Sequence, residues 1–382
     1  MNVIDLFSGV GGLSLGAARA GFNVSAAIEI DPYAIATHHL NFPKSKHFME
    51  DVSLLNGSVL LKNLNIESLD CLIGGPPCQG FSSIGKGDVD DSRNQLYYHF
   101  FRLISEIKPK FFLAENVPGI LNDKYDDIRD KAFSLINDEY CILSPLKVKA
   151  SDYGAPTTRT RIFFIGYRKE LGTNILNIES FLPKENTKSI CVEEALSGLD
   201  FFVDPSWQTE EQGWKVISTD FKGPYFEKLW GEIPEHVGDP FSLEQLKLGS
   251  VSGFLGTKHS KEVKQRYGNL SFGEVDKISK SKRLEPKGFC PTLRAGTGKE
   301  KGSFQAVRPI HPYQARVISP REAARLQGFP DWFRFHSTKW HSFRQIGNSV
   351  SPIVAEAMLL PIANACSEYD QSCIFENQGI AL

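Results

Sequence analysis

Strand-like and helix-like patterns alternate along the first 170 residues, and this alternation constrains the fold more than any other feature. Short apolar runs, which read as buried strands, occur at 2–7, 24–30, 71–75, 110–117 and 161–168. Amphipathic stretches lie between them at 13–20, 33–40, 95–107 and 125–137. Strands separated by helices of that length form βαβ units. The sequence therefore predicts an α/β fold with a doubly wound, mostly parallel sheet.

The pattern breaks near residue 171, where alternation weakens and Gly, Pro, Trp and Lys become frequent. Turn signals such as KGPY and GTGKEKGS recur up to about residue 315. We therefore expect a first domain made of 1–170 plus 316–382, and a second, loop-rich domain over 171–315.

The helical pattern returns after this region. SPREAARLQG predicts a helix with Ser319 as N-cap, Pro320 in the first turn and Gly328 at its end. A second helix is expected to start near Pro352.

Composition excludes several classes of protein. We find no run apolar enough to cross a bilayer and no export signal at the N-terminus. The seven cysteines form no C-x-x-C pair, so neither a metal site nor a disulfide framework is expected, and a reducing cytoplasm fits.

Charge is unevenly distributed although the net charge is only −2. Residues 171–245 hold five Lys or Arg against fourteen Asp or Glu, and residues 246–315 hold the reverse. The basic stretch could face phosphates, or the two stretches could be solvated faces that cancel. A linear count leaves both readings open.

The glycine-rich segment DLFSGVGG closes the first strand. Gly9, Gly11 and Gly12 permit a sharp turn and a close approach of a ligand to the backbone. Glu29 and Asp51 follow at the next two strand ends, where ligands of open α/β sheets bind. No lysine follows the loop as in a Walker motif, and its spacing departs from the NAD fingerprint. A nucleoside without a pyrophosphate fits this pattern.

The segment GGPPCQGFS places Cys78 after two glycines and two prolines, just past an apolar run. By itself it reads either as a turn with a buried cysteine or as a nucleophile on a loop after a strand.

Six segments together resemble the DNA (cytosine-5) methyltransferases of bacterial restriction–modification systems. In chain order they are DLFSGVGG, GGPPCQGFS, ENV, RTR, RLQGFP and IGNSV. The resemblance covers about 1–168 and 316–366, which is everything except the middle region. It implies the S-adenosylmethionine-dependent methyltransferase fold, with 171–315 as the target-recognition domain.

The resemblance implies S-adenosylmethionine as methyl donor. Phe7 matches the aromatic residue that packs on the adenine, Glu29 the ribose-binding acid and Asp51 the acid near the adenine amine. Asn348 would complete the pocket from the C-terminal part of the chain. The donor-site residues implied are Phe7, Gly9, Gly11, Gly12, Glu29, Asp51, Pro76, Leu96 and Asn348.

The resemblance also implies covalent catalysis, in which Cys78 adds to carbon-6 of cytosine and makes carbon-5 nucleophilic. Glu115 would hold the ring nitrogen and carry or share a proton, and Arg161 would hold the carbonyl oxygen. Arg159 would shape the same wall. Thr157 stands where the family usually has glutamine, which affects the orientation of Arg159.

The expected substrate is double-stranded DNA, from which the target cytosine must be flipped. Gln79 and Ser82 are expected to contact DNA beside the flipped base. Arg294 and Arg308, from the basic stretch, are also expected to contact DNA. We further expect a monomer in the bacterial cytoplasm, associated with the nucleoid and not with a membrane. A cognate restriction endonuclease would act separately.

Two other functions remain open. An RNA (tRNA) cytosine-5 methyltransferase would share the fold, but its usual Cys-Phe-Thr signature is absent. A non-catalytic nucleic-acid-binding module would not need Cys78, Glu115 and Arg161 together.

Overall fold

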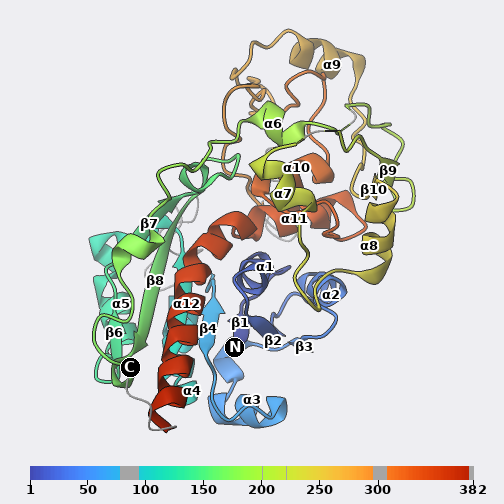
Figure 1. The fold of residues 1–382 in the computed structure, drawn as a ribbon. Coiled ribbons are helices and arrows are strands. Elements are labelled where there is room, and N and C mark those ends of the chain that lie inside the picture. The colour runs from blue at the N-terminus through green and yellow to red at the C-terminus, as the bar shows by residue number, and fades with distance from the viewer. Residues whose placement is uncertain (78–93, 200, 221, 296–307, 378–382) are drawn as a thin grey trace.

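The computed structural model describes residues 1–77, 94–199, 201–220, 222–295 and 308–377 (Figure 1). Its main sheet has eight strands in the order β3-β2-β1-β4-β5-β8-β6, and β7 also pairs with β8. The strands are β1 (Asn2–Leu6), β2 (Asn23–Ile28), β3 (Lys46–Phe48), β4 (Cys71–Gly74), β5 (Phe111–Asn116), β6 (Tyr140–Ile142), β7 (Leu146–Lys149) and β8 (Thr160–Arg168). A separate antiparallel pair is formed by β9 (Lys215–Val216) and β10 (Ser250–Val251).

The α-helices divide between the first part of the chain, the middle region and the C-terminal part. The first group is α1 (Gly12–Arg19), α2 (Pro32–Asn41), α3 (Gly57–Leu64), α4 (Asn94–Ile107) and α5 (Asp126–Phe133). The middle group is α6 (Val192–Leu196), α7 (Pro224–Trp230), α8 (Pro240–Lys247) and α9 (Lys261–Gly268). The last group is α10 (Pro320–Gln327), α11 (Lys339–Asn348) and α12 (Pro352–Asn377).

The first five strands of the sheet order run parallel, and the β6–β8 end is antiparallel. The carboxyl ends of β1, β2, β4 and β5 therefore meet at one edge, where ligands of such sheets bind. The antiparallel β8 brings its amino end to the same edge, because Asn116 at the end of β5 pairs with Ile162. The predicted doubly wound, mostly parallel sheet is confirmed.

Each face of the sheet has its own apolar core, because successive strand residues point to opposite sides. On one face Val3, Ile73 and Leu113 pack with apolar residues of α1, α10 and α12. On the other face Ile4, Leu72, Phe112 and neighbours pack with α3, α4 and α5.

The C-terminal helix returns to the N-terminal loop, as predicted. A Cβ on Gly12 would collide with the carbonyl oxygen of Val350, and one on Gly16 with Ala355. Only glycine permits this contact between α1 and the start of α12.

The stretch Lys339–Ser372 is long and apolar enough to cross a membrane by length and composition, so the expectation that no run has this character is wrong. In the structure 72% of its apolar window is buried. Met358 and Leu359 belong to the core cluster that α1 also lines. Burial inside the protein accounts for this hydropathy, since a core helix has the same composition.

The start of α10 follows its sequence prediction. Ser319 Oγ accepts the backbone N–H of Glu322, and the Glu322 side chain accepts the N–H of Ser319. Gly328 ends the helix with φ 94°. This capping box fixes the chain where it leaves the middle region.

The middle region, 171–315, contains short helices and the β9–β10 pair. Figure 1 shows α6 to α9 on the side of the molecule away from α3 and α4. Its buried residues Phe254, Leu284 and Leu293 belong to the same apolar cluster as Val3 of the sheet. The region is thus packed continuously onto the sheet domain, and its status as a second domain stays a prediction.

Candidate active site

The chain reaches the predicted nucleophile directly from β4. Gly75 follows this strand, and a Cβ there would lie 3.0 Å from Glu115 Oε2. Asn116 Nδ2 donates to the carbonyl oxygen of Pro76 at 3.5 Å. Cys78, Gln79 and Ser82 lie outside the described residues. The backbone that leads into Cys78 is therefore held against the end of β5.

Glu115 and Arg161 form an ion pair at this edge of the sheet, with Arg161 Nε 2.6 Å from Glu115 Oε1. Their side chains are only 12% and 14% exposed. Arg161 Nη1 also donates to the carbonyl oxygen of Thr160 at 2.7 Å. The structure brings together two residues that lie 46 positions apart and whose roles were predicted to be joint.

Arg159 points elsewhere, although it is only two residues from Arg161. Its Nη1 donates to the carbonyl oxygens of Gly347 at 3.0 Å and Leu293 at 3.2 Å. Its Nη2 donates to that of Asn348 at 3.4 Å. The backbone N–H of Arg159 donates to Thr157 Oγ1. Arg159 thus links the start of β8 to the middle region and to the end of α11.

The glycine-rich loop is tied to the end of β2. Glu29 Oε2 accepts the backbone N–H of Gly9 at 2.9 Å, and Oε1 accepts that of Asp31 at 2.8 Å. Phe7 and Gly9 have φ of 57° and 56°, so the backbone turns sharply before α1. Burial raises the pKa of Glu29. The loop and the predicted ribose-binding acid therefore form one unit.

Apolar surface lies beside this unit. Ile30, which follows Glu29, is 63% exposed, and Phe7 is partly buried. Asp51 caps the turn after β3 by accepting the N–H of Ser53 at 2.8 Å. Apolar side chains beside carboxylates suit a nucleoside, so these residues fit the methyl donor. Sequence reasoning did not single out Ile30, because only the structure reveals its exposure.

The remaining predicted donor-site residues are spread around the same edge. Gly11 and Gly12 lie at the start of α1, where Gly11 has φ 100°. Leu96 is partly buried in the first turn of α4, and Asn348 is exposed at the end of α11.

The two arginines predicted to contact DNA have different surroundings. Arg294 is exposed. Arg308 lies over the ring of Phe343, 4.1 Å from its centroid, and burial lowers its pKa to about 10. Part of the basic excess is neutralised locally, since Arg266 pairs with Asp276 at 2.6 Å.

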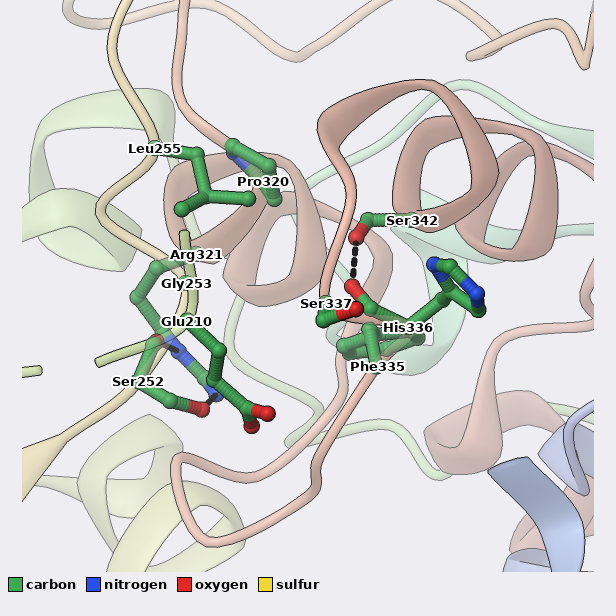
Figure 2. Close-up of a pocket in the computed structure, with 10 residues that line it drawn as sticks. All are labelled: Glu210, Ser252, Gly253, Leu255, Pro320, Arg321, Phe335, His336, Ser337 and Ser342. Atoms are coloured by element: carbon green, nitrogen blue, oxygen red, sulfur yellow. Dashed lines mark hydrogen bonds between the residues drawn. The ribbon is translucent and has the colours of Figure 1, made fainter. Parts of the chain in front are cut away.

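A separate pocket lies where the middle region meets α10 and α11 (Figure 2). Glu210, Ser252 and Arg321 line one side, and His336 and Ser342 the other. None of the predicted site residues lines it.

Relatives with recorded functions match almost the whole chain. The family model of the C-5 cytosine-specific DNA methylases matches residues 1–364. The Type II methyltransferase M.XorII of Xanthomonas oryzae pv. oryzae is 40% identical over 363 residues, covering 93% of this chain and 82% of the relative. M.DdeI of Desulfomicrobium norvegicum is 33% identical over 384 residues, covering 94% and 87%.

Solved structures agree with these relatives. A prophage-encoded protein of E. coli, described as a DNA modification methyltransferase, is 59% identical with a TM-score of 0.88, covering 96% of this chain and 99% of its own. The S. pombe Dnmt2 methyltransferase, 15% identical with a TM-score of 0.59 and coverages of 95% and 98%, shows the fold alone. The chain belongs to the C-5 cytosine-specific DNA methylases, which transfer a methyl group from S-adenosylmethionine to cytosine in DNA.

Proposed function

We propose that this enzyme flips a cytosine out of a specific duplex site and methylates carbon-5 through a covalent adduct with Cys78. The ion pair between Glu115 and Arg161 carries the proposal, because it lies at the end of β5 against the backbone that leads into Cys78. A carboxyl group and a guanidinium together match the ring nitrogen, amine and carbonyl of cytosine.

The chain's own residues would carry the chemistry in two stages. The Cys78 thiolate bonds to carbon-6, and Glu115 supplies a shared proton to the ring nitrogen, so that carbon-5 becomes nucleophilic. After transfer, the ring nitrogen returns its proton to Glu115, carbon-5 loses its proton to water, the thiolate leaves carbon-6 and the ring double bond re-forms. S-adenosylmethionine, when bound, supplies an electrophilic methyl group on a sulfonium sulfur.

Arg161 would change partners when the base enters. In the free enzyme its charge is balanced by Glu115. Cytosine offers its carbonyl oxygen to the guanidinium while Glu115 turns to the ring nitrogen, so neither charged group is left buried without a partner. Arg159, which donates hydrogen bonds to three carbonyl oxygens, would hold the start of β8 so that the Arg161 side chain stays oriented toward the base.

The middle region, 171–315, would serve as the target-recognition domain, and the duplex would contact the exposed Arg294. Gln79 and Ser82, which follow Cys78 in the sequence, would contact the DNA beside the flipped base. We place the enzyme in the bacterial cytoplasm on nucleoid DNA, as a monomer whose cognate endonuclease acts separately.

Labelled methyl transfer tests the proposed substrate. Purified enzyme is incubated with methyl-labelled S-adenosylmethionine and either unmethylated duplex DNA or tRNA, and the products are digested to nucleosides. We expect label in 5-methyldeoxycytidine, and bisulfite sequencing of an undigested sample of the duplex should place the modified cytosine at one short recurring sequence. Label in tRNA alone would overturn the proposal in favour of an RNA methyltransferase. Donor binding without transfer to either would favour a non-catalytic module.

A further inference from the structure

A line of hydrogen bonds runs from a buried carboxylate beside the glycine-rich loop to an exposed histidine. Asp5 of β1 is fully buried, and its Oδ2 accepts from the Ser14 hydroxyl of α1 at 2.6 Å. Ser14 Oγ lies 2.9 Å from His38 Nε2 of α2. His38 Nδ1 lies 2.9 Å from His47 Nε2, and His47 Nδ1 lies 3.1 Å from His39 Nδ1. We call these five residues the Asp5 relay.

The carboxylate at the inner end lies within electrostatic range of the predicted donor-site residue Glu29. Its second oxygen, Oδ1, is buried with no hydrogen-bond partner in the part of the chain that the structure describes. Glu29, the predicted ribose-binding acid, repels its charge. Burial and this repulsion raise the pKa of Asp5 to about 7, despite the bond from Ser14.

The groups around Asp5 offer it no positive charge. Its neighbour on β4 is Ile73, and α1 contributes the uncharged Ser14. Among the described residues the titratable groups that face it are Glu29 beyond β2 and, through Ser14, His38 of α2. Asp31, near Glu29, is instead 3.4 Å from Arg344.

The imidazoles of the relay are suited to pass a proton while remaining neutral. Burial lowers the pKa of His38, and that of His47 to about 4. A neutral imidazole has one donor and one acceptor nitrogen, so each ring can accept on one side and donate on the other.

We propose that Asp5 is a proton-linked carboxylate of the donor site, ionised with the cationic donor and protonated more readily with the neutral product, and that the Asp5 relay carries its proton to and from solvent. S-adenosylmethionine bears a sulfonium charge that S-adenosylhomocysteine lacks. A buried carboxylate with no cation of its own therefore discriminates between the two ligands by charge.

The proton shift balances, and all three histidines are neutral both before and after it. With Asp5 protonated, it donates to Ser14, Ser14 to His38 Nε2, His38 Nδ1–H to His47 Nε2, and His47 Nδ1–H to His39 Nδ1. Each proton then moves one bond outward, and His39 releases its Nε2 proton to water. Asp5 ends ionised, and all three histidines end neutral with the opposite tautomer.

Calorimetric titration of the wild-type enzyme tests the linkage. Donor and product are titrated at pH 6, 7 and 8 in buffers of different ionisation enthalpy. We expect donor binding at pH 7 to release about half a proton, and product binding to release less. The donor Kd should fall about fivefold from pH 6 to 7 and about twofold more from pH 7 to 8, whereas the product Kd changes less. Equal proton release for both ligands would overturn the proposal.

Two further measurements assign the effect to Asp5. Nitrogen NMR of labelled histidines should show His38 and His47 exchanging tautomers on donor binding, and unchanged tautomers would exclude the relay. Asp5→Asn should abolish the extra proton release, while Asp126→Asn, the same change at a surface ion pair with Arg129, should retain it. Undiminished release in Asp5→Asn would place the proton on another group, such as Glu29.

Discussion

The two halves of the proposed strand-end site differ in how their buried acids are paired. In the base half, at β5 and β8, Glu115 already has a cation, Arg161, 2.6 Å away. In the donor half, at β1 and β2, neither Asp5 nor Glu29 has a lysine or arginine as an ion-pair partner among the described residues, and burial raises the pKa of both.

This difference follows the charges of the two substrates. Cytosine is neutral, so the base half must contain both signs of charge to remain stable when empty. The methyl donor brings a positive charge, so the donor half can leave carboxylates unpaired until it binds. The predictions below separate the two halves, from the largest expected effect to the smallest.

Glu115→Gln should affect catalysis without affecting donor binding. The amide cannot supply the shared proton, and Arg161 loses its counter-ion, so we expect methylation to fall by about 10²–10⁴-fold. The donor Kd should stay within about twofold, by calorimetry. Glu139→Gln is the matched control, since Glu139 pairs with Lys108 at 2.8 Å on the surface. Loss of donor binding in Glu115→Gln would show that the base half and the donor half do not act separately.

Asp5→Asn should change the pH dependence of stability. The folded-state pKa of Asp5, about 7, lies above its ordinary value of 3.8. The protonated carboxyl therefore stabilises the fold fully below about pH 4, and this contribution is lost as pH rises through 7. Relative to Asp5→Asn, the wild type should lose about 2–4 kcal/mol of unfolding free energy from pH 4 to 8, by urea denaturation. A parallel pH profile in the variant would show that Asp5 is already ionised at low pH.

Glu29→Gln should weaken donor binding more than catalysis at saturating donor. The amide has one acceptor oxygen where the carboxylate accepts from both Gly9 and Asp31. We expect a rise of about 10–100-fold in donor Kd, with kcat reduced much less. Glu50→Gln is a control at an exposed acid near Asp51. A larger fall in kcat than in affinity would contradict the assignment of Glu29 to the donor half.

Arg294→Ala and Arg308→Ala divide the basic stretch of the middle region. Exposed Arg294 should contribute to duplex binding. Its loss should raise the Kd for DNA a few-fold and reduce the slope of log affinity against log salt concentration by about one. Arg308 lies against Phe343, and its loss should lower stability with little change in that slope. The reverse result, from binding measured over a salt series, would identify Arg308 as the phosphate contact.

Sequence reasoning succeeded where long apolar runs and turn residues dominate. It located β1, β2, β4, β5 and β8 within a few residues, and the capping box of α10 at Ser319. It missed the short β6 and β7, with three and four residues, because their pairing with β8 and not their composition makes them strands. It also missed α3, which begins at a glycine.

For the site, motifs identified residues but not their partners. Glu115 meets Arg161 only because β8 runs antiparallel to β5, which no local pattern indicates. Arg159 belongs to the same RTR segment as Arg161, yet its guanidinium donates to carbonyl oxygens of residues far along the chain. The Asp5 relay joins residues of β1, α1, α2 and β3, and depends on packing that a single sequence cannot specify.

Trapping on a duplex that contains 5-fluorocytosine at the target position tests the covalent role of Cys78 most directly. Fluorine at carbon-5 cannot leave as a proton does, so the adduct accumulates after methyl transfer. We predict a protein–DNA adduct that depends on S-adenosylmethionine, with the peptide around Cys78 as the only linked segment by mass spectrometry, and none in Cys78→Ser. A bound duplex that is methylated elsewhere but never linked, or linkage at another cysteine, would contradict this account.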